Sequence, residues 1–158
     1  MYRLNEKQPA LIEKLRRVAD EQIKPFAAEV DEKGRFPREA MDALARNGFF
    51  GLTIPAESGG LGQGMRVACA ALDELGQRCA STAMVYLMDL CGCACYVAHP
   101  KGHEETLKQA ARGEHLSALA WSEKGSRSHF WAPVSQAEAK NGNVTLRASK
   151  SWVTSAGE

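Results

Sequence analysis

The residues with the clearest chemical potential lie near the C-terminal end of the sequence, in two short segments. Residues 116–130 read LSALAWSEKGSRSHF, an apolar stretch that runs into a loop of hydroxyls, a glycine and basic side chains. Residues 149–158 read SKSWVTSAGE and carry Trp152 two positions before Thr154. Hydroxyls can hydrogen-bond the edge and the phosphates of a flat heteroaromatic cofactor, and an indole can stack on its ring face. The two segments therefore predict part of a site for such a cofactor.

A second group of reactive side chains, Cys91, Cys93 and Cys95, alternates along a segment with helical character. Zinc sites more often use C-x2-C pairs with a second pair elsewhere, and residues two apart on a helix point in different directions. We therefore interpret these cysteines as small buried thiols at a helix contact and predict no metal site. The glycine-rich residues 58–62 lack the lysine and hydroxyl of a phosphate-binding P-loop, so they predict a structural turn.

Composition and charge exclude several classes of protein. The 158 residues are 44% hydrophobic and 25% charged, as in an ordinary globular chain. The 20 basic and 19 acidic side chains leave a net charge of +1, which gives no electrostatic signal for nucleic acid or for an anionic membrane. An odd number of cysteines and a polar N-terminus without a cleavable signal sequence favour a reducing compartment. We therefore expect a cytoplasmic protein.

Apolar residues that recur at three- and four-residue steps predict helices over the first two-thirds of the chain. The first helix is expected to be long, and Pro25 should kink or divide it because proline removes a backbone donor. Residues 49–55 are apolar and β-leaning. The expected helices cover about 6–33, 37–46, 65–78, 81–99 and 103–112.

The helix expected over residues 81–99 differs from the others because it is apolar on all sides. Ser81 is its expected N-cap, and Asp89 is its only charged residue between 83 and 98. Such a helix belongs in the middle of a bundle. Its apolar stretch is too short for a membrane span, so we expect none.

The residue pattern changes after residue 113. Residues 116–121 alternate weakly and predict a strand. Asn141-Gly142 is the strongest short hairpin signal in the chain, because both turn residues must tolerate positive φ. Its flanks, 134–140 and 144–148, predict two strands, and 151–154 would form the next one. The end of the chain thus predicts the opening strands of a β domain, with an edge left unpaired.

The order of these elements and three short motifs resemble the acyl-CoA dehydrogenase family. SEKGSRSH at 122–129 stands where that family carries T-E-P-x-A-G-S-D, and KSWVTSA at 150–156 stands where it carries K-x-W-I-T-N-A/G. PAESGGLG at 55–62 is similar to the family's P-E-E-Y-G-G-L-G. The resemblance covers the whole chain but only the front part of the family's length. It implies a mainly α fold, with an N-terminal orthogonal bundle of about five helices in residues 1–115. The first strands of an incomplete, β-barrel-like middle domain would follow in 116–158.

The resemblance also implies FAD as the cofactor and assigns roles to single residues. Ser122 matches a threonine that hydrogen-bonds the flavin ring, and Ser128 matches a serine near the flavin pyrophosphate and the thioester. Trp152 matches an aromatic residue that packs against the isoalloxazine, and Thr154 a hydroxyl beside flavin N5. The implied cofactor-binding residues are Leu119, Trp121, Ser122, Ser128, Trp152, Val153 and Thr154. The implied substrate-binding residues are Ser128 and Arg127, together with Val85, Leu87 and Met88 of the helix that lines the family's acyl pocket.

The family's reaction is the α,β-dehydrogenation of an acyl-CoA thioester. A carboxylate base removes the α-proton while the β-hydrogen leaves as a hydride to flavin N5. In the family that base lies in a C-terminal bundle, so we expect it beyond Glu158 and expect this chain alone to be inactive. The resemblance further implies an acyl-CoA-type substrate, an electron-transfer flavoprotein or similar acceptor, and a homo-oligomer, dimer or tetramer.

Three positions depart from the family pattern. Lys124 replaces a proline, Arg127 a glycine and His129 an aspartate. These changes exchange one negative charge for two cations and an imidazole. Cations beside a diphosphate or a CoA phosphate are chemically reasonable, but the same changes would also suit a different substrate.

Two alternatives to the dehydrogenase interpretation therefore stay open. One is a flavin-dependent monooxygenase of the same architecture, in which reduced flavin meets oxygen. The other is a non-catalytic helical interaction module that has kept the fold. Flavin binding separates the module from both enzymes, and detection of a flavin hydroperoxide separates the monooxygenase from the dehydrogenase.

Overall fold

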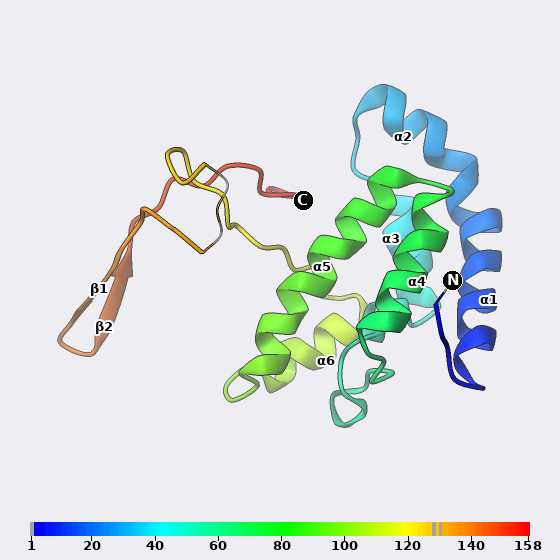
Figure 1. Ribbon diagram of the computed structural model, residues 1–158, viewed down its shortest axis with the longest axis horizontal. Coiled ribbons are helices and arrows are strands. Elements are labelled where there is room, and N and C mark those ends of the chain that lie inside the picture. Colours follow the sequence, from blue (N-terminus) through cyan, green and yellow to red (C-terminus); the bar gives the residue numbers. More distant parts are fainter. Residues whose placement is uncertain (1, 128, 130) are drawn as a thin grey trace.

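The computed structural model describes residues 2–127, 129 and 131–158. Its helices gather into one bundle, and the chain after α6 runs out from the bundle to a β-hairpin (Figure 1). The last residues return toward the bundle, where Glu158 forms an ion pair with Arg38 over 3.1 Å. The α-helices of this described part are α1 Gln8–Val18, α2 Ala27–Lys33, α3 Arg38–Arg46, α4 Met65–Gly76, α5 Ala80–Ala98 and α6 Glu104–Arg112.

The long first helix is divided, as predicted, at Pro25. α1 passes into a π-helical turn at Ala19–Ile23 and then a 3-10 turn at Lys24–Phe26 before α2 begins. Proline has no N–H to offer the preceding turn, so a regular α-helical ladder cannot continue through it. α2 then ends at Gly34, which takes a left-handed φ of 55°.

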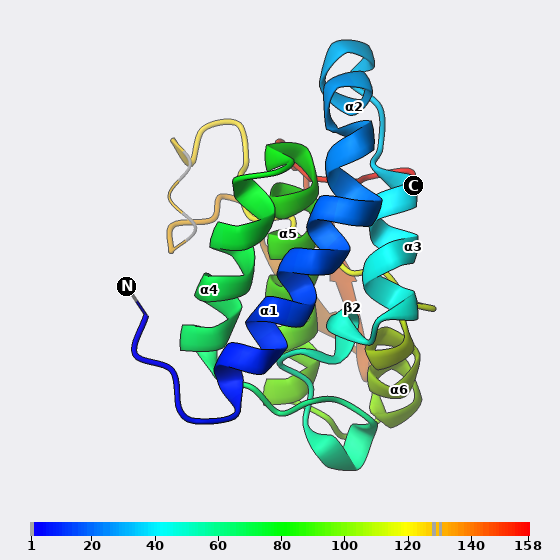
Figure 2. The ribbon, with the colours of Figure 1, turned by 90° about the vertical axis from the view of Figure 1, so that its right-hand side faces the viewer.

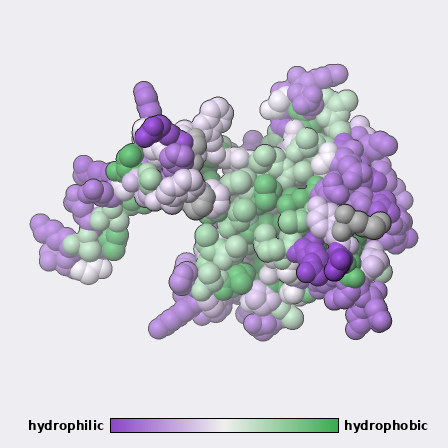
Figure 3. Space-filling view, viewed as in Figure 1, coloured by the Kyte–Doolittle hydropathy of each residue, from purple (hydrophilic) through white to green (hydrophobic). Residues whose placement is uncertain are grey.

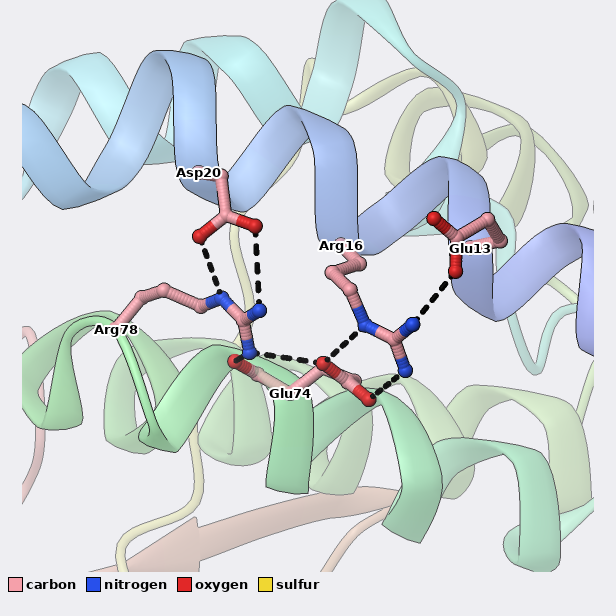
Figure 4. Close-up of polar contacts among 5 residues, drawn as sticks. All are labelled: Glu13, Arg16, Asp20, Glu74 and Arg78. Atoms are coloured by element: carbon pink, nitrogen blue, oxygen red, sulfur yellow. Dashed lines mark hydrogen bonds and ion pairs between the residues drawn. The ribbon is translucent and has the colours of Figure 1, made fainter.

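Five charged side chains join the first helix to α4 (Figure 4). Glu74 of α4 accepts hydrogen bonds from Arg16 at 2.7 Å and from Arg78 at 2.8 Å. Arg78 also reaches Asp20, on the π-helical turn, over 3.0 Å, and Arg16 reaches Glu13 over 2.6 Å. The Arg16 hydrogen bond lowers the pKa of Glu74. The network fixes α1 along the outside of the bundle, between α3 and α4 (Figure 2).

The apolar helix α5 packs against α2, α3, α4 and α6, but it is not enclosed by the bundle as predicted: only 39% of its apolar stretch is buried, and Met84 is 52% exposed. Its N-cap is Cys79, whose Sγ accepts the Thr82 amide, and not the expected Ser81. By length and hydropathy alone α5 would suffice to cross a membrane, but core helices of globular proteins pass the same test. The absence of a membrane span therefore stays a prediction.

Residues 49–55 fill the core without forming the expected β structure. They form a 3-10 turn at Phe49–Gly51 followed by bends, and Phe49, Phe50, Leu52 and Ile54 are all buried. The Tyr86 hydroxyl donates to the Phe49 carbonyl oxygen over 2.5 Å. The backbone amides of residues 61–63 donate to the carbonyl oxygens of Gly51, Leu52 and Ile54. Because these carbonyls are paired, the segment can be buried without a strand ladder.

The predicted Asn-Gly hairpin is present, and its strands are shorter than expected. β1, Ala137–Lys140, pairs antiparallel with β2, Asn143–Leu146, and every residue of both strands is exposed. The strands expected over 116–121 and 151–154 are absent from these described segments, which are extended chain or turn. A strand needs a hydrogen-bonded ladder to a neighbour, and the single bridge between Glu123 and Lys150 lies just outside these two segments, so neither segment forms a ladder.

Candidate functional site

The two C-terminal segments that carry the candidate residues meet at one backbone pair. The Ser151 amide donates to the Ser122 carbonyl oxygen over 2.8 Å, beside the antiparallel bridge of Glu123 and Lys150. This pairing sets Ser122 of the first segment next to the residue that precedes Trp152 in the second. The structure therefore brings together two groups of candidate residues about 30 positions apart in the sequence.

Glu123 holds this junction from the inside, with only 3% of its surface exposed. One carboxylate oxygen pairs with the Lys150 ammonium, and the other accepts the amides of Val134 at 2.7 Å and Ser135 at 2.8 Å. The hydrogen bond from Lys150, followed by that from the Ser135 amide, lowers the pKa of Glu123 to about 2. A single carboxylate thus ties the segment before Trp152 to both ends of the loop over residues 124–133.

The role of Glu123 was missed by sequence reasoning, although a signal was present. Glu123 directly follows Ser122, and Lys150 stands two residues before Trp152, so each motif carries one of two opposite charges. Opposite charges on neighbouring extended segments form stabilising cross-strand pairs. If the two motifs are taken to lie side by side, their opposite charges predict the contact between Glu123 and Lys150.

The loop that Glu123 closes also contains a strained arginine. The buried Ser126 hydroxyl donates to the Glu123 carbonyl oxygen over 3.0 Å and accepts its amide over 3.3 Å. Arg127 follows with φ of 50° and an exposed side chain. A left-handed backbone costs a non-glycine residue about 1–2 kcal/mol, and Arg127 stands where the family pattern has glycine. Ser128, the candidate with both a cofactor and a substrate role, lies outside the described residues.

Trp152, Val153 and Thr154 occupy a turn whose backbone is also strained. Trp152 has φ of 59° and is 85% exposed, while Val153 and Thr154 are half-buried. Ser155 has φ of 63°, and its buried hydroxyl has no hydrogen-bond partner among the described residues. Non-glycine residues with positive φ cluster at functional sites. An open indole face beside hydroxyls, one of them unsatisfied, fits a flat ring with polar edges.

The turn forms one wall of a cleft of about 540 Å³. Val153 and Ser155 face it from the turn, Val85 from α5, and Arg35 and Phe36 from the connection between α2 and α3. One predicted substrate residue, Val85, therefore shares a cleft with one predicted cofactor residue, Val153. The arrangement leaves space for a small molecule between the bundle and the C-terminal turn.

The other two predicted substrate residues lie elsewhere on α5. Leu87 lines an apolar groove of about 250 Å³ between α4 and α5, together with Met65 and Cys91, on the broad apolar face seen in Figure 3. Met88 is half-buried and lines neither space. Residues two apart on a helix do not share a face, so Val85 and Leu87 cannot line one pocket from α5. The structure thus places Val85 and Leu87 on different spaces, and the substrate role of these residues stays a prediction.

Asp89 anchors the segment that leads to Ser122, where the chain crosses α5. The carboxylate is fully buried and accepts the Ser117 amide over 2.8 Å. The Cys93 thiol also donates to it, at 3.9 Å. Burial raises the pKa of Asp89 to about 7, against the opposing effect of the Ser117 amide. Downstream of this anchor, Leu119 is half-buried and Trp121 is exposed on the extended chain before Ser122.

Comparison with protein families and curated proteins gives consistent matches. A family model described as Acyl-CoA dehydrogenase, N-terminal domain, matches residues 5–114. Probable acyl-CoA dehydrogenase FadE25 of Mycobacterium tuberculosis is 32% identical over 163 aligned residues, covering 100% of this chain and 41% of that protein. The 3-(aryl)acrylate reductase of Clostridium sporogenes is 34% identical, covering 94% of this chain and 41% of that protein. The chain thus spans about two fifths of the length of these curated relatives.

A solved structure has the same fold over nearly the whole chain. The glutaryl-coenzyme A dehydrogenase glutaryl-CoA complex superposes with a TM-score of 0.84 at 26% identity. The match covers 97% of this chain and 40% of that one. That solved structure therefore contains the fold of this chain within two fifths of its own length.

Proposed function

This chain belongs to the acyl-CoA dehydrogenase family, and we propose from that membership that it forms the helical and flavin-facing portion of an FAD-dependent acyl-CoA dehydrogenase. The observation that carries the proposal is the meeting of Ser122 and Ser151, which sets the first motif beside the exposed Trp152 and the Thr154 hydroxyl. Relatives named for acyl-CoA and glutaryl-CoA dehydrogenation support it.

The residues present fit one side of a flavin ring. When bound, FAD supplies a hydride acceptor at N5 of its ring. Trp152 offers an open aromatic face for stacking, while Ser122 and Thr154 offer hydroxyls for the polar ring edge. Glu123 and Lys150 fix the relative position of the two segments that carry these groups. The work of this chain is therefore to hold and orient the cofactor.

The reaction also needs a base for the α-proton of the substrate. The proposal places that base in the part of the relatives that this chain does not match, as the family pattern implies. The cleft lined by Val85 and Val153 would then lie between the bundle and the flavin-binding turn, as a space for the substrate. We also propose an electron-transfer flavoprotein or a similar acceptor, a dimer or tetramer, and a cytoplasmic location. These three proposals rest on the family resemblance and on the composition of the chain.

Replacement of Trp152 tests the flavin-facing assignment directly. We expect Trp152→Ala to weaken FAD binding about fivefold, because a stacked aromatic contributes on the order of 1 kcal/mol beyond its buried area. The measurement is an FAD titration of a chimera in which these 158 residues replace the matching two fifths of the M. tuberculosis relative.

A matched control is Tyr2→Ala, which removes another exposed aromatic, from the N-terminus. FAD affinity of this variant should equal that of the parent chimera. If Trp152→Ala also binds FAD as the parent does, the indole does not face the flavin and the assignment of the second motif is wrong.

A further inference from the structure

Helix α5 carries a pair of accessible thiols. Cys91 is half-buried and Cys95 is exposed, whereas Cys93 between them is buried and donates to Asp89. The prediction of buried thiols at a helix contact therefore holds for Cys93 and is wrong for Cys95. Residues four apart on a helix share a face and residues two apart do not, so Cys91 and Cys95 lie on one face and Cys93 on another.

The Cys95 sulfur leans back over the turn that contains Cys91. Its Sγ lies 3.8 Å from the Cys91 carbonyl oxygen, as expected for a helical side chain that tilts toward the N-terminus of its helix. Burial and the neighbouring Cys95 group raise the pKa of Cys91. Cys91 therefore stays a protonated thiol at neutral pH, one helical turn from the Cys95 thiol.

The spacing of this pair selects what can bridge it. Side chains four apart on a helix have Cβ atoms about 5–6 Å apart, and a disulfide needs about 3.5–4.5 Å, so a direct S–S bond would require the backbone of α5 to move. A single atom between the two sulfurs spans the wider gap. Structural zinc needs four ligands, and no group of three or more metal-ligating side chains occurs in residues 2–127, 129 and 131–158. The pair therefore suits a soft atom that needs only two sulfurs.

An apolar groove begins at Cys91. It is the groove of about 250 Å³ between α4 and α5, which Leu72, Leu87 and Ala94 also line. Leu87 lies four residues before Cys91, on the same face of α5 as the two thiols. A ligand that bonds to both sulfurs can therefore bury an apolar substituent in the groove, and this burial adds to its affinity.

We propose that Cys91, Cys95 and the adjoining groove bind trivalent organoarsenicals. Trivalent arsenic is a soft atom with three bonds, two of which go to the thiols while the third holds the carbon substituent that lies in the groove. In the binding step the two As–O bonds of an organoarsonous acid break and two As–S bonds form. Each thiol proton leaves with a hydroxide as water, and the arsenic stays trivalent. The site lies apart from the flavin-facing segments and goes beyond the proposed function.

The test titrates the reduced 158-residue chain with phenylarsine oxide. We expect one arsenical per chain and the loss of two titratable thiols from the five free cysteines. Cys91→Ala and Cys95→Ala should each weaken binding at least about tenfold, because the second As–S bond forms at a high effective concentration. The matched control Cys69→Ala removes an exposed thiol from α4 and should leave the affinity unchanged. Alanine is the best helix former, so all three variants should stay folded.

Leu87→Ser tests the groove separately from the thiols. This variant should weaken the binding of phenylarsine oxide about threefold, because the phenyl group loses an apolar contact. Binding of inorganic arsenite, which has no carbon substituent, should not change. If phenylarsine oxide binds Leu87→Ser as tightly as wild type, the groove is not part of the site.

Protection from iodoacetamide locates the two bonds. The bound arsenical should protect Cys91 and Cys95 from alkylation and leave the exposed Cys69 reactive. The proposal is overturned if the wild type loses fewer than two thiols per arsenical, if Cys91→Ala binds as tightly as wild type, or if Cys69→Ala loses as much affinity as Cys95→Ala. Flavin binding by the chimera does not depend on these thiols, so this proposal and the dehydrogenase proposal can fail independently.

Discussion

Replacing Asp89 with asparagine is expected to stabilise the chain at about pH 8 by on the order of 3 kcal/mol, and by less than about 1 kcal/mol at pH 4. Burial raises the pKa of Asp89 from 3.8 to about 7. The contribution of Asp89 to the free energy of unfolding is therefore fully present below pH 3.8, the pKa of the group in the unfolded chain. This contribution is lost as pH rises through about 7, its pKa in the folded chain. Asparagine cannot ionise, and its carbonyl oxygen can still accept the Ser117 amide.

Chemical unfolding across this pH range is the measurement. Asp73→Asn, which changes an exposed carboxylate on the neighbouring helix α4, should follow the pH profile of the wild type. If Asp89→Asn is instead less stable than wild type at pH 8, the ionised carboxylate is favourable at its site. The interpretation of Asp89 as a buried group that ionises at a cost would then be wrong.

Adding one methyl group at Gly92 should also have a large effect, because the chain crosses α5 at this point. A Cβ there would lie 2.6 Å from the Ser117 Cβ and 3.0 Å from the Ala118 amide nitrogen. Alanine favours a helix over glycine by about 1 kcal/mol, but overpacking a close backbone crossing costs about 1–3 kcal/mol. We expect Gly92→Ala to lower the free energy of unfolding by up to about 2 kcal/mol, which is the overpacking cost less the helix gain.

Gly76→Ala is the matched control on α4. A Cβ at Gly76 would meet only the Ala83 Cβ, at an ordinary 3.9 Å. This variant should be as stable as wild type or slightly more stable, by up to about 1 kcal/mol. Equal stabilisation by both substitutions in urea unfolding would show that residues 117–118 do not pack against α5 as closely as the structure places them.

The helical part of the fold was predictable because its signals are local. Apolar spacing marked the helices, Pro25 marked the break between α1 and α2, and Asn141-Gly142 marked the hairpin turn. Each of these depends on a few neighbouring residues, through helical periodicity, a missing donor or a turn that needs positive φ.

The failures concern elements that depend on distant partners. Residues 116–121 and 151–154 have strand-like composition, but the one bridge nearby joins Glu123 and Lys150 just outside them, so a ladder does not form. Residues 49–55 look β-leaning because they are apolar, yet their apolar side chains fill the core from a turn and a Tyr86 hydroxyl takes a carbonyl. Composition alone does not report which neighbour will satisfy a backbone group.

In the candidate site, too, the local features were predictable and the contacts between distant residues were not. Motif resemblance found the segments that carry Ser122 and Trp152, and the structure brings those segments together. The contacts that set their position, those of Glu123 with Lys150 and of Asp89 with Ser117, join residues 27 and 28 positions apart and were missed. The cofactor and substrate roles of the candidate residues themselves stay predictions.

Flavin reduction in the chimera tests the central claim most directly. These 158 residues would replace the matching part of the M. tuberculosis relative, and the purified protein would be mixed anaerobically with acyl-CoA thioesters of different chain length. If this chain is the flavin-facing portion of an acyl-CoA dehydrogenase, the chimera binds one FAD per chain and at least one thioester bleaches the oxidised flavin absorbance. A folded chimera that retains no FAD, or whose FAD no thioester bleaches, would contradict the account.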